Sequence, residues 1–236
     1  KTGEVRSMNE TGKKWVDDPR LAVPAQLMTP AQVLETLTAA AGSHFMDGRT
    51  AEWTEGDSGA PYRQVWIRIG REGLRAVAKR LTEIHYPHFV VIAATDLGET
   101  IELPYVFRIY VGVLRQEILV TVTAVLPKAD PVVDTLSDLI PGVLLSEREK
   151  QEMMGVRVAN IPDGRRMFLP DDFPQGVYPW RKDETGPTPN MTKNLWATGR
   201  GEFDAKATAR AEAEKQAAEA AVAAATPAAG SEGAAP

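Results

Sequence analysis

The hydrophobic pattern of residues 63–124 constrains the fold of this chain more than any other feature of its sequence. Apolar side chains occupy every second position of 63–69, which is the period of a half-buried strand. Over 71–85 they recur every three to four residues, which predicts a helix with one apolar face. Three more strands are predicted after this helix, at residues 88–95, 103–112 and 116–124. The last two are expected to form a hairpin, because only three residues separate them.

Helices are expected on both sides of this region. Thr29 is a suitable N-cap and Pro30 a suitable first residue for a helix that ends at Gly42. Asp130-Pro131 predicts the start of another helix, which would stop before Pro141. Its buried face would consist of five apolar residues: Val132, Val133, Leu136, Leu139 and Ile140.

A last helix is predicted by a capping-box pattern, in which the Ser146 hydroxyl and the Glu149 carboxylate each bind the other residue's backbone N–H. Gly155 would end this helix in a left-handed conformation. Residues 48–61 are predicted to form a loop with a short strand near 51–54. The whole pattern predicts an α+β fold, in which a mainly antiparallel sheet of about four strands carries helices on one face.

Composition divides the chain into four segments. Residues 1–28 are polar and without a period, so an extended or disordered arm is expected before the α+β domain at 29–156. Residues 157–204 mix charges with prolines, which indicates an extended interface arm. Residues 205–236 form an Ala-rich tail that is expected to be helical or disordered.

Charge and cysteine content exclude several kinds of function. The chain has a formal net charge of −5, which argues against general nucleic-acid binding. It contains no cysteine, so it can hold neither a disulfide nor a cluster with thiolate ligands. No apolar run approaches the ~20 residues of a membrane-spanning helix, so a soluble chain is expected that reaches a membrane only through a partner. Because the sequence begins at Lys1, it leaves open whether a targeting segment precedes it.

A series of spaced motifs follows the sheet region. They are Glu147-Arg148-Glu149, Met153-Met154-Gly155-Val156, Pro162-Asp163, Arg165-Arg166, Leu169-Pro170-Asp171-Asp172 and Pro179-Trp180-Arg181-Lys182-Asp183. In this order they resemble the C-type subunit of respiratory complex I, the NADH:quinone oxidoreductase, and its counterpart in membrane-bound energy-converting NiFe hydrogenases. Typical members have E-R-E, D-x-F-G-I, G-H-P-D-x-R-R and P-L-R-K-D. This chain departs from them at four places: Glu152, Met154, Asn160-Ile161 and Trp180. The wording of residues 169–183 is more similar to the hydrogenase members, so the hydrogenase branch is favoured.

The resemblance implies a cofactor-free structural or assembly subunit in the peripheral arm of an ion-translocating redox complex, on the cytoplasmic side of the membrane. It would pack against the large subunit of NiFe hydrogenase or complex I type, beside other peripheral Fe–S subunits. Fe–S and NiFe centres, or FMN and quinone, would belong to the partners. The implied partner interface consists of charged residues of the motifs: Glu147, Arg148, Glu149, Glu152, Arg165, Arg166, Asp171, Asp172, Arg181, Lys182 and Asp183.

Several of these charges also have a local interpretation. Glu147 and Glu149 suit the first turn of any helix. Arg148 and Glu152 are four residues apart and could pair on an exposed helix face. Arg165 and Arg166 could form salt bridges with the aspartates at 171–172.

Independent catalysis is the less favoured interpretation. His85 and His88 flank a proline and lack a third ligand nearby, which argues against a metal site. Asp171 and Asp172 are adjacent in an extended segment, where two carboxylates point apart. A free-standing α+β binding module that has kept the motifs remains the rival to a complex subunit.

Overall fold

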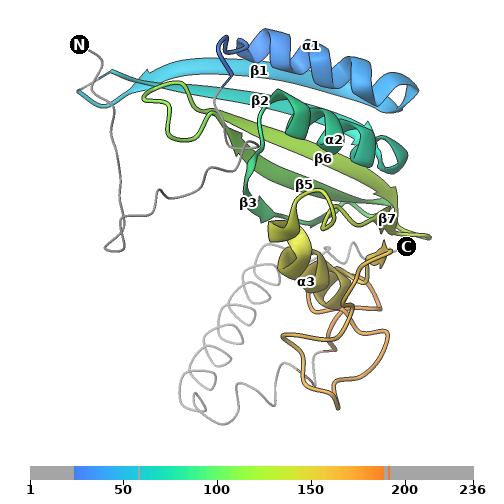
Figure 1. The fold of residues 1–236 in the computed structure, drawn as a ribbon. Helices are drawn as coiled ribbons and strands as arrows, with labels where there is room; N and C mark the ends of the chain where they lie inside the picture. Colours follow the sequence, from blue (N-terminus) through green and yellow to red (C-terminus); the bar gives the residue numbers. More distant parts are fainter. Residues whose placement is uncertain (1–23, 58, 189–190, 192–236) are drawn as a thin grey trace, which may run out of the picture. The chain divides into compact units, whose positions relative to one another are not determined.

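The computed structural model describes residues 24–57, 59–188 and 191 (Figure 1). The chain divides into two compact units, Lys1–Gly186 and Pro187–Pro236, and the fold described below belongs to the first. Most of the predicted N-terminal arm and the whole Ala-rich tail at 205–236 lie outside the described residues.

A six-stranded sheet forms the centre of this unit. Its strands are β1 (Phe45–Glu55), β2 (Ala60–Gly70), β3 (His88–Ile92), β4 (Thr95–Asp96), β5 (Thr100–Ile109) and β6 (Ile118–Pro127). The order is β1-β2-β6-β5-β3, with β4 paired to β5. Every pair is antiparallel except β2–β6, which is parallel. The prediction of a mainly antiparallel sheet and of a hairpin between the strands now called β5 and β6 is confirmed.

Strand β1 is longer than the sequence indicates. Where a loop with a short strand is predicted, the structure has an edge strand of 11 residues that pairs with β2 along its whole length. Most of its side chains are exposed, so it lacks the apolar alternation of a half-buried strand. Gly48 lies where α1 (Pro30–Ala41) comes close, because an added Cβ would be 2.8 Å from Leu34 Cδ1.

Three α-helices complete the unit: α1 (Pro30–Ala41), α2 (Leu74–Ile84) and α3 (Leu144–Met154). Helices α1 and α2 cover one face of the sheet (Figure 1). The capping box of α1 joins Thr29 to Gln32, with N–O distances of 2.9 and 3.3 Å. Short 3₁₀ turns precede or follow the helices: η2 (Gly42–His44), η3 (Arg71–Gly73) and η4 (Pro141–Val143).

The core lies between the two helices and the sheet. Val65, Ile67 and Ile69 of β2 face Val120, Val122 and Ala124 of β6, all nearly inaccessible to solvent. Tyr105 and Phe107 of β5 continue the same layer. Alternation along these strands therefore identified the buried face correctly.

The prediction of a helix after Asp130-Pro131 is wrong. Residues Val132–Asp134 instead form a short strand, β7, which pairs in parallel with β8 (Arg157–Ala159). Leu136 and Ile140 still enter the core, but from a turn. The apolar spacing of this segment fits a helix, whereas β-branched valines pair readily between strands.

The predicted N-terminus of α3 is also wrong, whereas its C-terminus is confirmed. The helix begins at Leu144 after the turn at Pro141, so Ser146 lies inside its first turn and makes no cap. Gly155 ends the helix with φ +66°, and its N–H bonds to the carbonyls of Lys150 and Gln151. Only glycine adopts this conformation without strain.

Candidate functional site

The motif residues gather around α3, where residues 157–186, the part of the arm that belongs to the first compact unit, fold against the helix. Glu147 is the most deeply buried charged residue among those that the structure describes, with 1% of its surface exposed. Its carboxylate accepts hydrogen bonds from the Thr135 hydroxyl at 2.6 Å and from the Leu136 N–H at 2.8 Å. Burial raises the pKa of Glu147, and these two hydrogen bonds oppose the shift. Glu147 thus fixes the turn after β7 inside this chain.

Arg148 and Glu152 hold the backbone of the loop at residues 165–173, called the tip loop below. Arg148 donates to the carbonyls of Arg165 at 2.9 Å and Arg166 at 3.3 Å. Glu152, which is buried, accepts from three consecutive amides: Met167, Phe168 and Leu169. The two side chains are one helical turn apart and lie on one face of α3. They bind the tip loop instead of each other; we call this pair the α3 clamp.

Lys150 is another charged side chain of α3 with little access to solvent. Only 2% of it is exposed, and its ammonium group pairs with Glu149. The same group lies 4.8 Å from the centre of the Trp180 ring, within range of a cation–π contact. Sequence reasoning missed this buried lysine, because nothing in its local pattern distinguishes it from an exposed one.

The two arginines of the tip loop differ in their surroundings. The Arg165 side chain is 85% exposed and pairs with Asp163 at 2.9 Å, and its hydrogen bond is the main reason that the pKa of Asp163 is lowered. Arg166 donates to the Pro170 and Phe173 carbonyls at 3.1 and 3.0 Å. Asp171 and Asp172 are exposed, and no basic group of the described residues lies within ion-pair distance of them. The alternative in which the arginines pair with these aspartates is therefore wrong.

The last motif closes the C-terminal end of α3. Arg181 Nε donates to the Met154 carbonyl at 2.8 Å, and the Trp180 N–H donates to the Met153 carbonyl at 3.0 Å. These carbonyls have no partner within the helix itself. The Tyr178 ring lies directly against Gly155, where a Cβ would overlap it. The arm thus supplies a C-cap to a helix that ends well before it in the sequence.

Asp183 joins the arm to the turn that follows β6. It pairs with Lys128, which also pairs with Asp96 at 2.8 Å. The hydrogen bond from Lys128 is the largest cause of the lowered pKa of Asp183. Lys182, next to it, is exposed.

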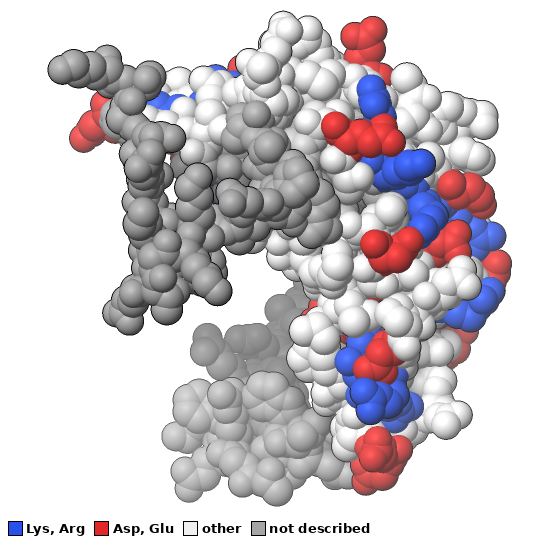
Figure 2. All heavy atoms as spheres, viewed as in Figure 1, with Lys and Arg blue, Asp and Glu red and all other residues white. Residues whose placement is uncertain are grey.

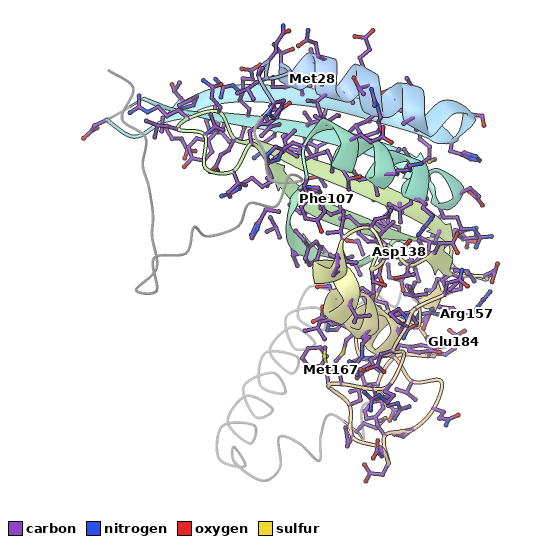
Figure 3. The ribbon with its side chains drawn as sticks, in the orientation of Figure 1. Met28, Phe107, Asp138, Arg157, Met167 and Glu184 are labelled. Carbon is purple, nitrogen blue, oxygen red and sulfur yellow. The ribbon has the colours of Figure 1, made fainter. Side chains whose placement is uncertain are left out.

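Apolar side chains of the tip loop face outward although its backbone is bound. Met167 is 37% exposed and Phe168 is 55% exposed. Figure 3 shows Met167 beside α3, far from Met28 at the start of α1. Acidic and basic side chains alternate along one side of the unit, without a large block of either sign (Figure 2). The charged motifs point to this region, but sequence reasoning missed the apolar pair that follows Arg166.

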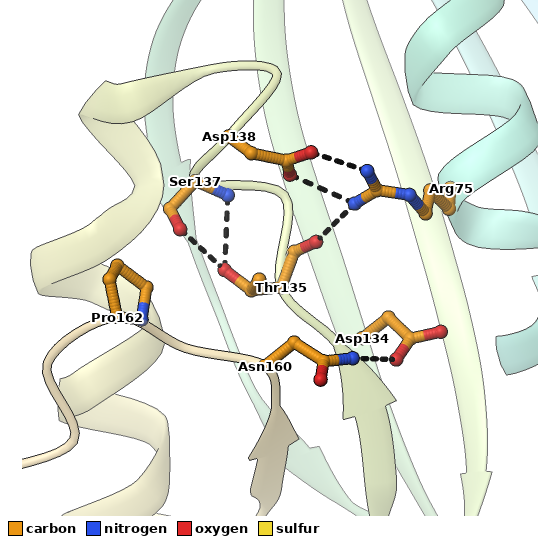
Figure 4. A pocket seen from close by; sticks show the side chains of 7 residues that line it. All are labelled: Arg75, Asp134, Thr135, Ser137, Asp138, Asn160 and Pro162. Carbon is orange, nitrogen blue, oxygen red and sulfur yellow. Dashed lines mark hydrogen bonds and ion pairs between the residues drawn. The ribbon is translucent and has the colours of Figure 1, made fainter.

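A polar hollow of about 510 Å³ lies near α3, between α2 and the ends of β7 and β8 (Figure 4). Arg75 makes a bidentate ion pair with Asp138 there. The hydrogen bonding from Arg75 is the main reason that the pKa of Asp138 is lowered. Asn160 donates to Asp134 at 3.3 Å and has φ +59°. Asparagine tolerates the left-handed region better than most residues. These polar groups are already paired with one another.

The residues weighed for catalysis do not come together. His85 is buried and its Nδ1 accepts from the Tyr110 N–H at 3.4 Å, whereas His88 is exposed on β3. Within the described ranges, no three His, Asp or Glu side chains are placed to hold a metal ion. The same part of the chain contains no helix long and apolar enough to cross a membrane.

Known proteins match this chain in both sequence and fold. A membrane-bound hydrogenase subunit beta from Pyrococcus furiosus is 38% identical over 133 residues, covering 56% of this chain and 76% of that protein. The C-type subunit of the NADH-quinone oxidoreductase from Acidothermus cellulolyticus is 35% identical over 103 residues, covering 44% of this chain and 47% of that protein. A chain of an archaeal membrane-bound sulfane sulfur reductase has a similar fold, with a TM-score of 0.54 at 18% identity over 71% of this chain and 91% of that one.

The resemblance inferred from the motifs is confirmed by a family model that matches residues 67–190. These residues contain β6, α3 and the arm as far as residue 190, the elements that build the site described above. The chain therefore belongs to the family of the 30-kDa subunit of respiratory-chain NADH dehydrogenase.

Proposed function

We propose that this chain is a cofactor-free structural subunit of a membrane-bound, ion-translocating redox complex of the energy-converting hydrogenase type. The observation that carries the proposal is the 38% identity to a membrane-bound hydrogenase subunit beta over three quarters of that protein. The polar hollow, whose charges are internally paired, adds no support for catalysis by this chain. Peripheral attachment on the cytoplasmic side, through the complex alone, belongs to the same proposal.

The interface with the large subunit is proposed to lie on the arm. Glu147, Glu152 and Arg181 bind other parts of this chain, so their contribution to a partner is to hold the arm in shape. The exposed charges of Arg165, Asp171, Asp172 and Lys182 remain available for direct contact. Charged side chains in such positions give register and specificity more than affinity.

A second candidate function is that of the C-type subunit in an NADH:quinone oxidoreductase. It is favoured by the 35% identity to the Acidothermus cellulolyticus protein, which spans about half the length of that relative. The two candidates differ in the cofactors that the partner subunits would hold. These are nickel–iron and Fe–S centres in the first case, and FMN, Fe–S centres and quinone in the second.

Purification through a tag on this chain, from membranes solubilised in mild detergent, tests the proposal. Native mass spectrometry is expected to show this chain bound to a large subunit, and metal analysis is expected to show nickel as well as iron. Bound FMN with NADH oxidation, and no nickel, would reverse the preference between the two candidates. Recovery of this chain as a monomer would overturn both and leave the free-standing binding module.

A further inference from the structure

The sheet presents a second set of side chains on the face opposite to α1 and α2 (Figure 1). On β2 and β6 these include Gln64, Trp66 and Leu119, which alternate with core residues and are only partly buried. Beside them, Trp53 of β1 stacks on Tyr62 of β2 with 5.7 Å between the ring centres, and both rings are exposed. This face therefore offers aromatic surface that the core does not use.

A hollow of about 360 Å³ opens on this face, where β2 and β6 begin and β5 ends; its lining includes Tyr62, Gln64 and Leu119. Three arginines and a single glutamate also line it: Arg63, Arg108, Arg115 and Glu117. Arg63 pairs with Glu52 at 3.5 Å and Arg108 with Glu117 at 3.2 Å, whereas Arg115 has no acidic partner among the described residues. We call this site the basic hollow. Its excess of positive charge, in a chain of net charge −5, favours an acidic occupant.

The described part of the chain begins at the same end of the sheet. Pro24 is its first residue, and the Met28 N–H donates to the Tyr110 hydroxyl at 3.1 Å. Tyr110 directly follows β5 and is only two residues from Arg108, which lines the basic hollow. The N-terminal segment is thus tied to the sheet close to the hairpin that carries Arg108 and Arg115.

The segment that precedes Pro24 contains a sequence complementary to the basic hollow. Trp15-Val16-Asp17-Asp18 combines an aromatic ring with two adjacent carboxylates. Six residues lead from Pro24 back to Asp18, and an extended chain of that length spans up to about 20 Å. This exceeds the thickness of one sheet layer, about 10 Å, so the segment is long enough to pass round the end of the sheet to the other face.

We infer that residues 15–18 of this chain occupy the basic hollow, with Asp17 and Asp18 facing Arg108 and Arg115 and with Trp15 against the exposed ring of Tyr62. Exposed ion pairs stabilise a contact only weakly. Here the segment belongs to the same chain, so its high effective concentration compensates for weak contacts. The inference goes beyond the proposed function and does not depend on it.

Disulfide trapping in the full-length chain tests the inference, because the chain has no cysteine of its own. Val16→Cys is combined with Gln64→Cys in the basic hollow, or with Ala31→Cys on the exposed surface of α1 as the matched control. Mild oxidation is expected to close the Val16–Gln64 pair about tenfold faster than the Val16–Ala31 pair. Adding Asp17→Asn/Asp18→Asn is expected to slow the first reaction about fivefold and to leave the second unchanged.

The outcomes of this trapping experiment separate the possible occupants. Equal rates for the two cysteine pairs would overturn the inference and leave the basic hollow to another protein. Cross-linked dimers in place of monomers would overturn it in favour of a second copy of this chain. An unchanged urea midpoint of the reduced Val16→Cys/Gln64→Cys variant shows that it still folds.

Limited trypsin digestion tests the same contact with no cysteine introduced. Trypsin cleaves after Lys14, next to Trp15, and occupation of the basic hollow protects this bond. Arg115→Gln removes a side chain without an acidic partner in the described chain, so it is expected to leave the fold intact and to speed this cleavage about threefold. Arg80→Gln, on α2, is the matched control and is expected to leave the rate unchanged. Equal rates in wild type and Arg115→Gln would contradict the contact.

Discussion

Replacement of Gly155 by alanine tests whether the arm stabilises the C-terminal end of α3 or only lies beside it. Gly155 has φ +66°, and a Cβ there would overlap the Tyr178 ring. A left-handed conformation costs a residue with a Cβ about 1–2 kcal/mol. Displacement of a packed ring adds about 1–3 kcal/mol. Together these give a loss of about 2–5 kcal/mol in the free energy of unfolding.

Gly176 provides a matched control in the same arm. It has φ +77°, and an added Cβ would meet no atom within 4 Å. Gly176→Ala is therefore expected to lose only the backbone part, about 1–2 kcal/mol. The difference between the two variants measures the contact between Gly155 and Tyr178.

Urea unfolding of the full chain, followed by circular dichroism, measures these losses as shifts of the midpoint at constant m-value. Displacing Tyr178 also pulls on the hydrogen bonds from Trp180 and Arg181 to the end of α3. In a Gly155→Ala/Tyr178→Ala double variant the overlap is gone, so the loss is expected to be smaller than the sum of the single losses by about 1–3 kcal/mol. Equal losses for the two glycine variants, or strict additivity with Tyr178→Ala, would refute the reasoning.

Two further predictions concern buried titratable groups. Glu147→Gln is expected to change stability by less than about 1 kcal/mol, because the amide still binds the Thr135 hydroxyl and the Leu136 N–H, whereas Glu147→Ala leaves that N–H unpaired and loses about 2 kcal/mol or more; urea midpoints that are equal for the two variants would contradict this. Desolvation lowers the pKa of His85, whose Nδ1 accepts from the Tyr110 N–H. Because the unfolded chain takes up this proton near about pH 6.5, the stability gained from neutral His85 is present above that pH and is lost as the pH falls towards the lower folded-state pKa. Unfolding curves of wild type and His85→Gln at several pH values check this, and parallel pH dependences would contradict it.

The sheet could be predicted where one face of a strand is buried and the other is not. The alternation in β2, β5 and β6 follows from packing against α1 and α2 on a single side. Strand β1 lies at the edge with most side chains exposed, so its sequence carries no such pattern. Its place depends on backbone pairing with β2, which local sequence does not reveal.

In the segment after β6, apolar residues have the spacing of a helix although the segment forms a short strand and a turn. Val132, Val133, Leu136 and Ile140 have helical spacing, yet the first two belong to β7 and the others to a turn. The Thr135 side chain accepts from the Ser137 N–H at 3.0 Å, a local bond that competes with a helix. The parallel pairing of β7 with β8 brings together residues on both sides of α3, and no local rule predicts it.

The family of the chain could be recognised from its motifs, because their order and spacing survive individual substitutions. The partners of the motif side chains could not be predicted in the same way. Arg148 and Glu152 have the spacing of a surface ion pair, but the arm returns along the helix and offers them backbone groups. The path of the arm depends on two contacts between residues far apart in the sequence: Gly155 with Tyr178, and Lys128 with Asp183. Contact between the exposed charged side chains of the arm and the large subunit stays a prediction.

The parallel ladder between β2 and β6 has a consequence for the order of folding. Strands β1 and β2 pair as sequence neighbours, as do β5 and β6, so each pair closes a short loop. Strands β2 and β6, in contrast, are separated in the sequence by η3, α2, β3, β4 and β5, so their pairing closes a much longer loop. Contacts of such long range carry the larger loop-closure entropy and slow the overall rate. We expect two hairpins to appear early in refolding and the seam between them to form last, so that it governs the folding rate of the whole sheet.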